Sequence, residues 1–501
     1  MSELPTIIGH PRRWFILSIL TLSLVMVVAS VSSMNLALPA IQRGLNATAS
    51  QIVWINASYA LMLAAILLPA GALGDRFGRR GALLVGLGIM LTGAVLGATS
   101  DSAAQIIAWR CLMGVGAGLV MPATLSILTT VFPANERSRA IAIWAGFAGA
   151  GGAIGILAAG VLLEYFWWGS IFFVNIPIAI ALFVLTVLFV PSSRDSLRHP
   201  MDPLGGVLST GALAALVFAL VQGPEYGWTD PLILGSAVTS VLLGRAWVAA
   251  EQRSEHPMLD PSLFRIPRFG LGSLGIASAF AVMFGMFFGF AQFMQFVLGY
   301  SALDTAIRTL PFAATMIAFS QFGPRLASRI GVRSVIAGGL AVTAVGLLWM
   351  STVTVASGYL HVVGGLSLAA AGMALSFPAA TEAIVTSLPQ DKAGVASAVN
   401  DTTREVGAAV GIALLGSLMS SGYRRSVGDA FDALPPAAAE AARDSVGAAL
   451  HVAQQAPESV RSSLVITARA GFAEGFSLAM TVGAALLATI AVVVFRWFPK
   501  D

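Results

Sequence analysis

Charged residues are scarce in this chain, and so are the residue types that build metal or disulfide sites. Of 501 residues only 10% are charged, and there are five histidines and one cysteine, Cys111. A single cysteine excludes a disulfide framework within the chain. The histidines are scattered and no Walker loop is present, so we expect no metal, no cofactor and no enzyme activity.

Hydrophobic residues take the place of the missing charge. They make up 57% of the chain, and the mean hydropathy is +0.84, unlike a soluble globular protein. Because a helix needs about 20 mostly apolar residues to cross a bilayer, we expect an all-α polytopic membrane protein. The fourteen expected spans are 14–38, 52–72, 81–99, 104–128, 140–163, 171–190, 204–222, 231–249, 270–297, 305–327, 334–355, 359–384, 395–419 and 474–495.

The basic residues fall mainly in alternate loops. With the N-terminus in the cytoplasm, the short outer loops hold two of them, Arg43 and Arg308, whereas the cytoplasmic segments hold nineteen. These nineteen are Arg12, Arg13, Arg76, Arg79, Arg80, Arg137, Arg139, Arg194, Arg198, Arg245, Arg253, Arg265, Arg268, Arg325, Arg329, Arg333, Lys392, Arg496 and Lys500. Positive charge collects on the cytoplasmic side, so the sequence predicts that both termini lie inside. Of the 28 basic residues 26 are arginine, a bias typical of high-GC bacterial genes, so we expect a protein of the bacterial cytoplasmic membrane. Arginines scattered over short loops give no sign of nucleic-acid binding.

A weak internal repeat divides the chain. Four residues between the second and third spans recur 253 residues later: Leu73, Arg76, Gly78 and Arg80 return as Leu326, Arg329, Gly331 and Arg333, while Asp75 maps onto Ser328. This offset predicts a six-span half over 1–190, two linking spans over 191–264 and a second six-span half over 265–501. The second half contains an extracytoplasmic insertion at about 422–471, whose alanine-rich runs predict two short amphipathic helices.

The loop between the second and third spans reads Gly71-Ala-Leu-Gly-Asp-Arg-Phe-Gly-Arg-Arg80 and crowds four charges around a glycine turn. It resembles the signature loop of the major facilitator superfamily. Further segments resemble motifs of that superfamily, and one of them a motif of its multidrug exporters: Arg110-Cys-Leu-Met-Gly-Val-Gly-Ala-Gly118, Phe132-Pro-Ala-Asn-Glu-Arg-Ser-Arg139, Phe172-Phe-Val-Asn-Ile-Pro177 and Asn400-Asp-Thr-Thr-Arg-Glu-Val-Gly407. Together with the span count, these matches point to the 14-span drug:proton antiporter branch.

This resemblance implies a secondary transporter that exports amphipathic drug-like molecules with proton coupling, working as a monomer among membrane lipids. Two positions depart from the pattern. Ser30 stands where the resembling exporters carry a first-span acid, although Asn35-Leu-Ala-Leu-Pro39 matches, and Ile156 replaces the proline of the fifth-span antiporter motif. The alternative is therefore a lipid or lipid-conjugate exporter on the same fold, with unusual or no proton coupling. Gly151, Gly155 and Gly160 keep the fifth span slim enough for close packing.

The resemblance assigns a conformational latch to the signature loop. Asp75 is expected to join the two halves near the start of the span at Val395, where a helix N-terminus favours negative charge. Arg76, Arg79 and Arg80 accompany it, chiefly as topology anchors.

Ionisable residues inside spans are the candidates for proton coupling. Arg110 lies within an apolar helix and must face a wet cavity or a partner, and the resemblance links it to protons. Asp401, Arg404 and Glu405 share one face of the thirteenth span, either as a static pair or as a titrating site. Polar residues in other spans are cavity candidates: Asn35, Asn56, Tyr59, Gln292 and Gln295. The ninth span is rich in phenylalanine and methionine, which favours a lipid-facing surface over a substrate wall.

Overall fold

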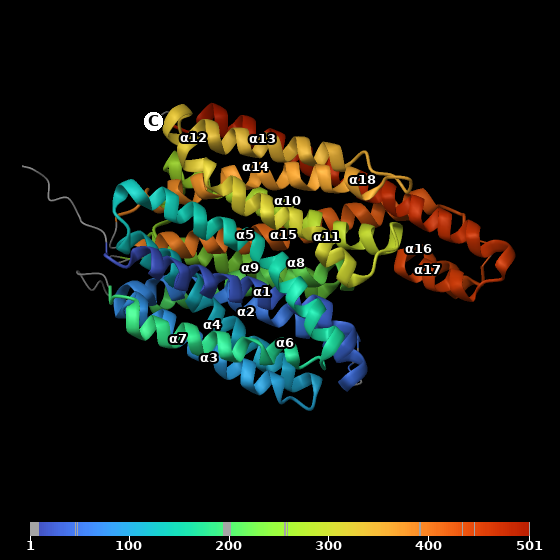
Figure 1. Cartoon of the computed structure of the whole chain (residues 1–501), viewed down its shortest axis with the longest axis horizontal. Coiled ribbons are helices and arrows are strands. Elements are labelled where there is room, and N and C mark those ends of the chain that lie inside the picture. The colour runs from blue at the N-terminus through green and yellow to red at the C-terminus, as the bar shows by residue number, and fades with distance from the viewer. Residues whose placement is uncertain are drawn as a thin grey trace, which may run out of the picture.

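The computed structural model describes residues 10–45, 47, 49–193, 202–254, 257, 259–389, 392–432, 434–444 and 446–499. Over these ranges the chain forms helices and no strand, which confirms the predicted all-α class (Figure 1). Thirteen of the helices described are long and apolar enough to cross a membrane by length and composition. The fold is that of a multi-pass membrane protein, as the composition predicts.

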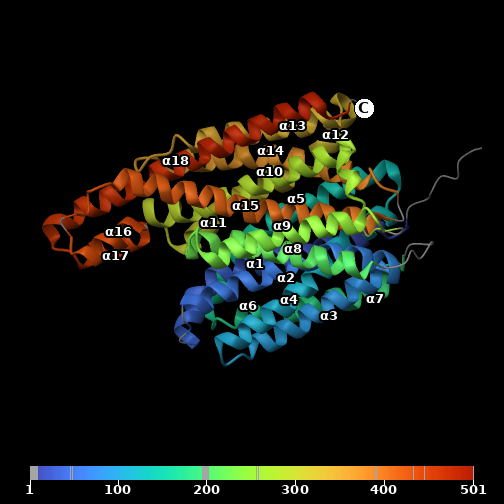
Figure 2. The same ribbon diagram turned by 180° about the vertical axis from the view of Figure 1, so that it is seen from behind.

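The first half of the bundle, called here the N half, consists of helices α1 to α7. Their bounds are α1 Arg13–Leu45, α2 Ala49–Phe77, α3 Arg79–Ala98, α4 Ala103–Val131, α5 Ala134–Tyr165, α6 Ser170–Phe173 and α7 Asn175–Phe189. A linking pair follows, α8 Pro203–Tyr226 and α9 Pro231–Glu251, and lies side by side along the bundle (Figure 2). Two of the basic residues expected in the preceding loop, Arg194 and Arg198, lie outside the described residues.

The C half consists of the elements after Glu251. It begins with a short 3₁₀ turn, η1 Pro261–Arg265. The helices are α10 Pro267–Gln292, which continues as a π-helical turn η2 Phe293–Val297, then α11 Ala302–Ser320, α12 Phe322–Ile330, α13 Val332–Met350, α14 Tyr359–Val385, α15 Ala393–Val427, α16 Pro436–Asp444, α17 Val446–Gln455 and α18 Glu458–Trp497.

The tenth predicted span, 305–327, is divided between α11 and α12, which meet at Gln321. Neither helix counts among the thirteen long apolar ones. The first turns of α11 contain the charged residues Asp304 and Arg308, and α12 has only nine residues. Nevertheless α11 packs between α5 and α14, so it takes its place in the C half of the bundle.

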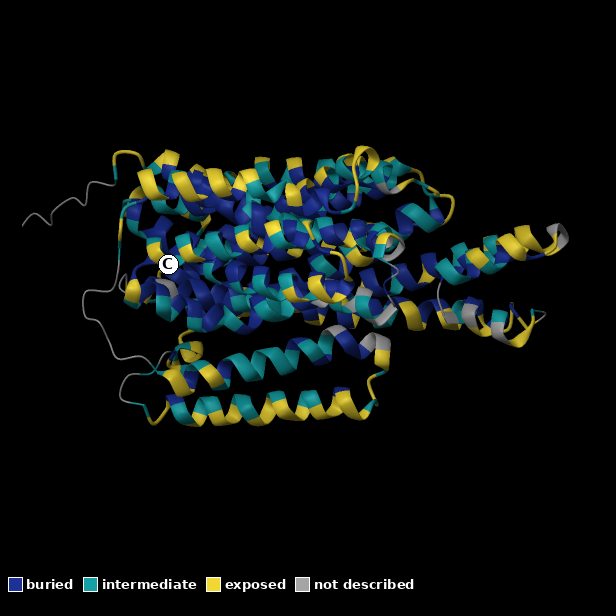
Figure 3. Ribbon diagram, turned by 90° about the horizontal axis from the view of Figure 1, so that it is seen from below, coloured by how far each residue is buried: buried dark blue, intermediate teal, exposed yellow. Residues whose placement is uncertain are grey.

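Two helices run far beyond the expected membrane boundary. The expected spans 395–419 and 474–495 lie within α15 and α18, which have 35 and 40 residues. Their extensions carry α16 and α17, which project from one end of the bundle (Figure 1). We call this the hairpin end, and the opposite end, with residues 71–80, the signature-loop end. Buried residues fill the centre of the bundle, and exposed ones lie on its outer faces (Figure 3).

The sequence repeat has a structural counterpart. Gly78 separates α2 from α3 with φ +115°, and Gly331 separates α12 from α13 with φ +83°. Side chains rarely adopt positive φ, so glycine is needed at both turns. The repeat thus preserves the turn in both halves, while the acid at Asp75 occurs only in the first.

Candidate functional site

Asp75, the expected latch residue, lies at the end of α2 and is 7% exposed. One carboxylate oxygen accepts hydrogen bonds from Arg79, with the closest approach at 2.8 Å. The other accepts the backbone N–H of Val395 at 3.1 Å. Because α15 begins at Ala393, this N–H belongs to the first turn, where amides lack helical partners and the dipole favours an anion. The expected contact between the halves is therefore present.

The three arginines of the loop have different surroundings. Arg79 is buried against Asp75. Arg80 donates to the carbonyl of Val187 at 2.5 Å, which ties the loop to the end of α7. The guanidinium of Arg76 lies over the ring of Phe77 at 5.6 Å. Arg79 thus lies directly against the Asp75 carboxylate, and Arg80 anchors the loop within the N half.

A second contact joins the halves at the signature-loop end. Ser138, near the start of α5, donates a short hydrogen bond to the carboxylate of Glu382, near the end of α14. Arg137 lies close enough to Glu382 to interact electrostatically. The pairing of these two residues, which are 244 positions apart, could not be predicted from the sequence. At the signature-loop end, hydrogen bonds therefore join the halves at two places, α2 to α15 and α5 to α14.

Arg110 lies in α4 and is 1% exposed. Its Nε donates to the carbonyl of Ile55 on α2, and its Nη1 donates to the carbonyl of Ser30 on α1, each at 3.2 Å. Its guanidinium stacks over the ring of Tyr59 at 4.3 Å. The remaining nitrogen, Nη2, is buried without a hydrogen-bond partner. The N half therefore holds a desolvated cation whose hydrogen bonds go to backbone carbonyls.

The departure at Ser30 falls directly beside this cation. The Ser30 hydroxyl donates to Met26 in its own helix, so only its backbone faces Arg110. Tyr59, a cavity candidate, is fully buried and donates its hydroxyl to Val27 one turn earlier on α1. A carboxylate at position 30 would lie near Arg110, and the serine leaves that arginine without the counter-charge.

The thirteenth-span set forms a buried ion pair on α15. Asp401 is fully buried, and its Oδ1 accepts from Arg404 at 3.2 Å and from Asn400 at 3.1 Å. Its Oδ2 has no hydrogen-bond partner, and neither does Nε of Arg404. Buried polar atoms without partners are unusual, and each of these two could form one more hydrogen bond with a water molecule or a ligand. The expected pair is present, with spare hydrogen-bonding capacity.

Two aromatic residues enclose Arg404: Trp144, which the sequence did not single out, and Phe280, one of the ninth-span phenylalanines. Its guanidinium lies 5.4 Å from the ring centre of Trp144 on α5 and 4.6 Å from that of Phe280 on α10. Trp144 is fixed by a hydrogen bond from its indole N–H to Thr124 at 3.3 Å. Because Trp144 belongs to the N half and Arg404 to the C half, this stacking also joins the two halves.

Glu405 connects the two buried clusters. It follows Arg404 on α15, and its carboxylate lies within electrostatic range of Tyr59, the residue stacked on Arg110. The helix α15 packs against both α2 and α4, which carry Tyr59 and Arg110. The structure therefore brings together Arg110 and Tyr59 from the N half with Asp401, Arg404 and Glu405 from the C half.

The other cavity candidates have different surroundings. Asn35 is exposed on α1, and the side chain of Asn56 lies outside what the structure describes. Gln292 donates to the Phe288 carbonyl of its own helix, and Gln295 is half-buried in the π turn at the end of α10.

The fifth-span glycines make different contacts. A Cβ at Gly155 would lie 2.6 Å from backbone atoms of Ala29, and one at Gly151 would lie 3.1 Å from Val28. Both positions let α5 approach α1 next to Ser30. Gly160 faces Leu303 of α11, where a Cβ would meet a flexible side chain at 3.2 Å. Close packing of this helix thus survives without the motif proline.

The expectation of a lipid-facing ninth span is wrong for three of its seven phenylalanines, which are buried. Phe280, Phe290 and Phe293 are buried, while Phe288 is 45% exposed. Phe280 stacks on Phe377 of α14 with ring centres 4.7 Å apart. These three phenylalanines pack inside the C half, because α10 packs against α14, α15 and α18.

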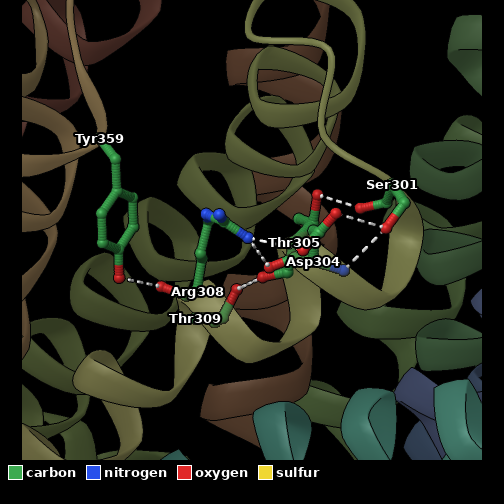
Figure 4. Close-up of polar contacts among 6 residues, drawn as sticks. All are labelled: Ser301, Asp304, Thr305, Arg308, Thr309 and Tyr359. Carbon is green, nitrogen blue, oxygen red and sulfur yellow. Dashed lines mark hydrogen bonds and ion pairs between the residues drawn. The ribbon is translucent and has the colours of Figure 1, made fainter.

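A polar network braces the start of α11 at the hairpin end (Figure 4). Ser301 caps the helix by accepting the N–H of Asp304, and Asp304 forms an ion pair with Arg308 at 2.8 Å. The hydroxyl of Tyr359 donates to the Arg308 carbonyl at 3.0 Å, which links α14 to α11. The Arg308 guanidinium also lies over the ring of Tyr300 at 4.1 Å.

Known proteins share this architecture over nearly its whole length. The human organic anion transporter TETRAN has a TM-score of 0.63 at 14% identity, covering 97% of this chain and 100% of its own. The proton:xylose symporter XylE has a TM-score of 0.60 at 14% identity, and the match covers 97% of this chain and 96% of XylE. At such low identity these likenesses concern the fold.

Sequence relatives are closer. The multidrug efflux pump LfrA of Mycolicibacterium smegmatis is 34% identical over 96% of both chains. The tetracenomycin C resistance and export protein of Streptomyces glaucescens is 33% identical over 97% of this chain and 91% of its own. The methyl viologen resistance protein SmvA of Salmonella typhimurium is 30% identical over 97% of this chain and 98% of its own. Residues 20–412 match the profile of the Major Facilitator Superfamily, and the chain belongs to that family of membrane transporters.

Proposed function

We propose that this protein exports amphipathic drug-like molecules across the bacterial cytoplasmic membrane by alternating access, in exchange for protons. The observation that carries the proposal is the set of nearly full-length relatives named as drug efflux or resistance proteins, at 30–34% identity. The geometry supports alternating access, because two halves meet at Asp75–Val395 and Ser138–Glu382 and ionisable clusters are buried between them.

The proton site in this proposal is the α15 set. Protonation of Asp401 would remove the charge that holds Arg404, and would free that guanidinium from its partner. Glu405 lies one turn farther along the helix, toward Tyr59 and Arg110. A proton bound by these acids can therefore change contacts within both halves. Ser30 cannot ionise, and Arg110 stays charged, so neither carries the proton itself.

Transport in reconstituted vesicles tests the proposal, with the pH gradient and the membrane potential imposed separately. We expect methyl viologen or an ethidium-type dye to move against its gradient when a pH gradient is present. The double variant Asp401→Asn and Glu405→Gln should abolish substrate-induced proton uptake while membrane abundance stays normal. Proton uptake that survives in this variant would contradict the assignment, and transport insensitive to the pH gradient would contradict proton exchange.

The second candidate is export of a lipid or lipid conjugate. Ser30 beside Arg110 favours it, because an unneutralised buried arginine suits an anionic headgroup. Mass spectrometry of lipids retained by the purified protein, together with growth of an overexpressing strain on cationic dyes, separates the two. Dye resistance that is indifferent to added lipid would exclude the lipid function.

The direction of export requires the signature-loop end to face the cytoplasm, with both termini there. The nineteen-to-two distribution of basic residues supports this orientation. Labelling of single cysteines with a membrane-impermeant maleimide in whole cells tests it. A cysteine in place of exposed Ser421, near the hairpin end, should react from outside, and one in place of exposed Phe77 should not.

A further inference from the structure

The end of α10 has an unusual backbone. Residues Phe293–Val297 form a π-helical turn, and Gly299 follows with φ +75°. The N–H of Leu298 donates to Phe293, and that of Tyr300 donates to Met294, at 3.1 and 3.0 Å. π turns inside helices occur frequently at functional sites.

The Phe296 carbonyl in this turn is bound from another helix. It accepts a hydrogen bond from Nε of Arg469 on α18 at 3.0 Å. The last carbonyls of a helix have no partners within it and carry partial negative charge, so a cation is favourable there. Arg469 therefore caps the C-terminal end of α10 from a distance of 173 residues in sequence.

Other elements hold the same turn. A Cβ at Gly447 of α17 would lie 3.3 Å from the Phe296 ring, so the projecting hairpin rests against that ring. Phe293 packs on Phe476 of α18 with ring centres 5.3 Å apart. Tyr300 lies under the guanidinium of Arg308, the arginine of the α11 network in Figure 4.

This turn presents two candidate cavity residues. Gln295 lies within it and Gln292 immediately precedes it. Gln292 is occupied with its own helix, whereas Gln295 is half-buried at position three of the turn. Because a π turn rotates each residue less than an α turn does, the direction of Gln295 depends on whether the turn persists.

We propose that Arg469 is a positioning residue for substrate specificity: by holding the Phe296 carbonyl it maintains the π turn that aims Gln295 at the substrate. The substrates affected are those with amide or hydroxyl groups that can hydrogen-bond to a glutamine side chain. Molecules that lack such groups bind without a hydrogen bond from Gln295. This inference rests on the proposed export function, since it concerns the selectivity of that transport.

Two probes differ in the required property. Puromycin carries amide and hydroxyl groups, whereas methyl viologen has neither hydrogen-bond donors nor acceptors. In vesicles we expect Arg469→Leu to raise KM for puromycin about tenfold, the size of one lost hydrogen bond, and to leave kcat unchanged. KM for methyl viologen should stay the same. Arg469→Lys, which keeps the cation, should restore much of the puromycin affinity.

A double-mutant cycle with Gln295→Leu tests whether the two residues act together. If Arg469 acts through Gln295, its replacement has no further effect on puromycin KM once Gln295→Leu is present. The matched control is Arg461→Leu on the same helix, which contacts carbonyls of Gln454 and Ala456 at the tip of the hairpin and should change neither KM. The proposal would be overturned if Arg469→Leu and Gln295→Leu raised the KM for puromycin by independent factors that multiply in the double variant. Equal changes in KM for puromycin and methyl viologen would also overturn it.

Hydrogen exchange provides a measurement that does not depend on transport. In Arg469→Leu the amides of Leu298 and Tyr300 should exchange at least tenfold faster, while those of residues 276–286 should not change. Unchanged exchange at the turn would refute the positioning role even if the protein transports both probes. Wild-type protein that transports neither probe would instead refute the proposed function, whatever the exchange result.

Discussion

Replacement of Asp75 by asparagine should open the signature-loop end. The carboxylate bridges Arg79 within the N half and the N–H of Val395 on α15, so it is the charge that joins the halves at this point. Asparagine can still accept the Val395 N–H through its carbonyl oxygen, but the charge on the α15 dipole is lost. Arg79, which is 2% exposed, would also lose its ion-pair partner.

The magnitude follows from the burial of the site. A negative charge at a helix N-terminus contributes about 0.3–1 kcal/mol when exposed and up to about 2 kcal/mol when partly buried. Asp75 belongs to the second case, and about 2 kcal/mol changes an equilibrium about 30-fold. We therefore expect the closed signature-loop end to lose up to this factor in population relative to the open one, and turnover to fall because the closed state forms too rarely.

Alkylation of a buried cysteine measures this opening. Ala396 is fully buried and packs against the N half, so Ala396→Cys in a Cys111→Ala background should react with N-ethylmaleimide only when the halves part. Adding Asp75→Asn should accelerate the reaction about tenfold or more. Asp101→Asn, an exposed acid near the hairpin end, is the matched control. Equal alkylation rates and equal transport at equal membrane abundance would refute the latch.

Loss of the Arg79 partner raises the separate question of folding. In the double variant Asp75→Asn and Arg79→Gln neither member of this buried ion pair carries a charge, so thermal stability should recover toward wild type. The latch charge is still absent, so transport should stay low. Recovery of transport together with stability would show that Asp75 serves folding rather than the conformational change.

Three further predictions concern the membrane interior. Gly155→Ala should reduce transport at least tenfold because its Cβ would meet the Ala29 backbone at 2.6 Å, whereas Gly338→Ala, with nothing within 4 Å, should have no effect in the same uptake assay. Gln222→Leu should stabilise the protein by about 1–3 kcal/mol, seen as a higher melting temperature in detergent, because both polar atoms of this buried amide lack partners. Arg110→Lys should lower export at least tenfold at normal abundance, since an ammonium cannot reproduce the forked bonds to Ser30 and Ile55, and wild-type kinetics would contradict this.

Local patterns in the sequence are sufficient to predict the membrane-spanning helices and the glycine turns between them. Apolar runs of about 20 residues specify membrane spans because the backbone must hydrogen-bond to itself in lipid. The glycine turns at Gly78 and Gly331 are equally local, because positive φ is a property of one residue. The division of 305–327 at Gln321, and the π turn in α10, were not predicted, because they depend on what the helices pack against.

Within the candidate site, the sequence alone identified residues whose chemistry is costly in a membrane: Arg110, Asp401 and Arg404. The resemblance added the contact of Asp75 with α15. The tertiary structure decided the partners of these residues. Trp144 stacks on Arg404 from 260 positions away, and such contacts leave no periodic signal in the chain. The phenylalanines of α10 show the same limit, because facing lipid and facing a neighbouring helix require equally apolar side chains, and only packing distinguishes them.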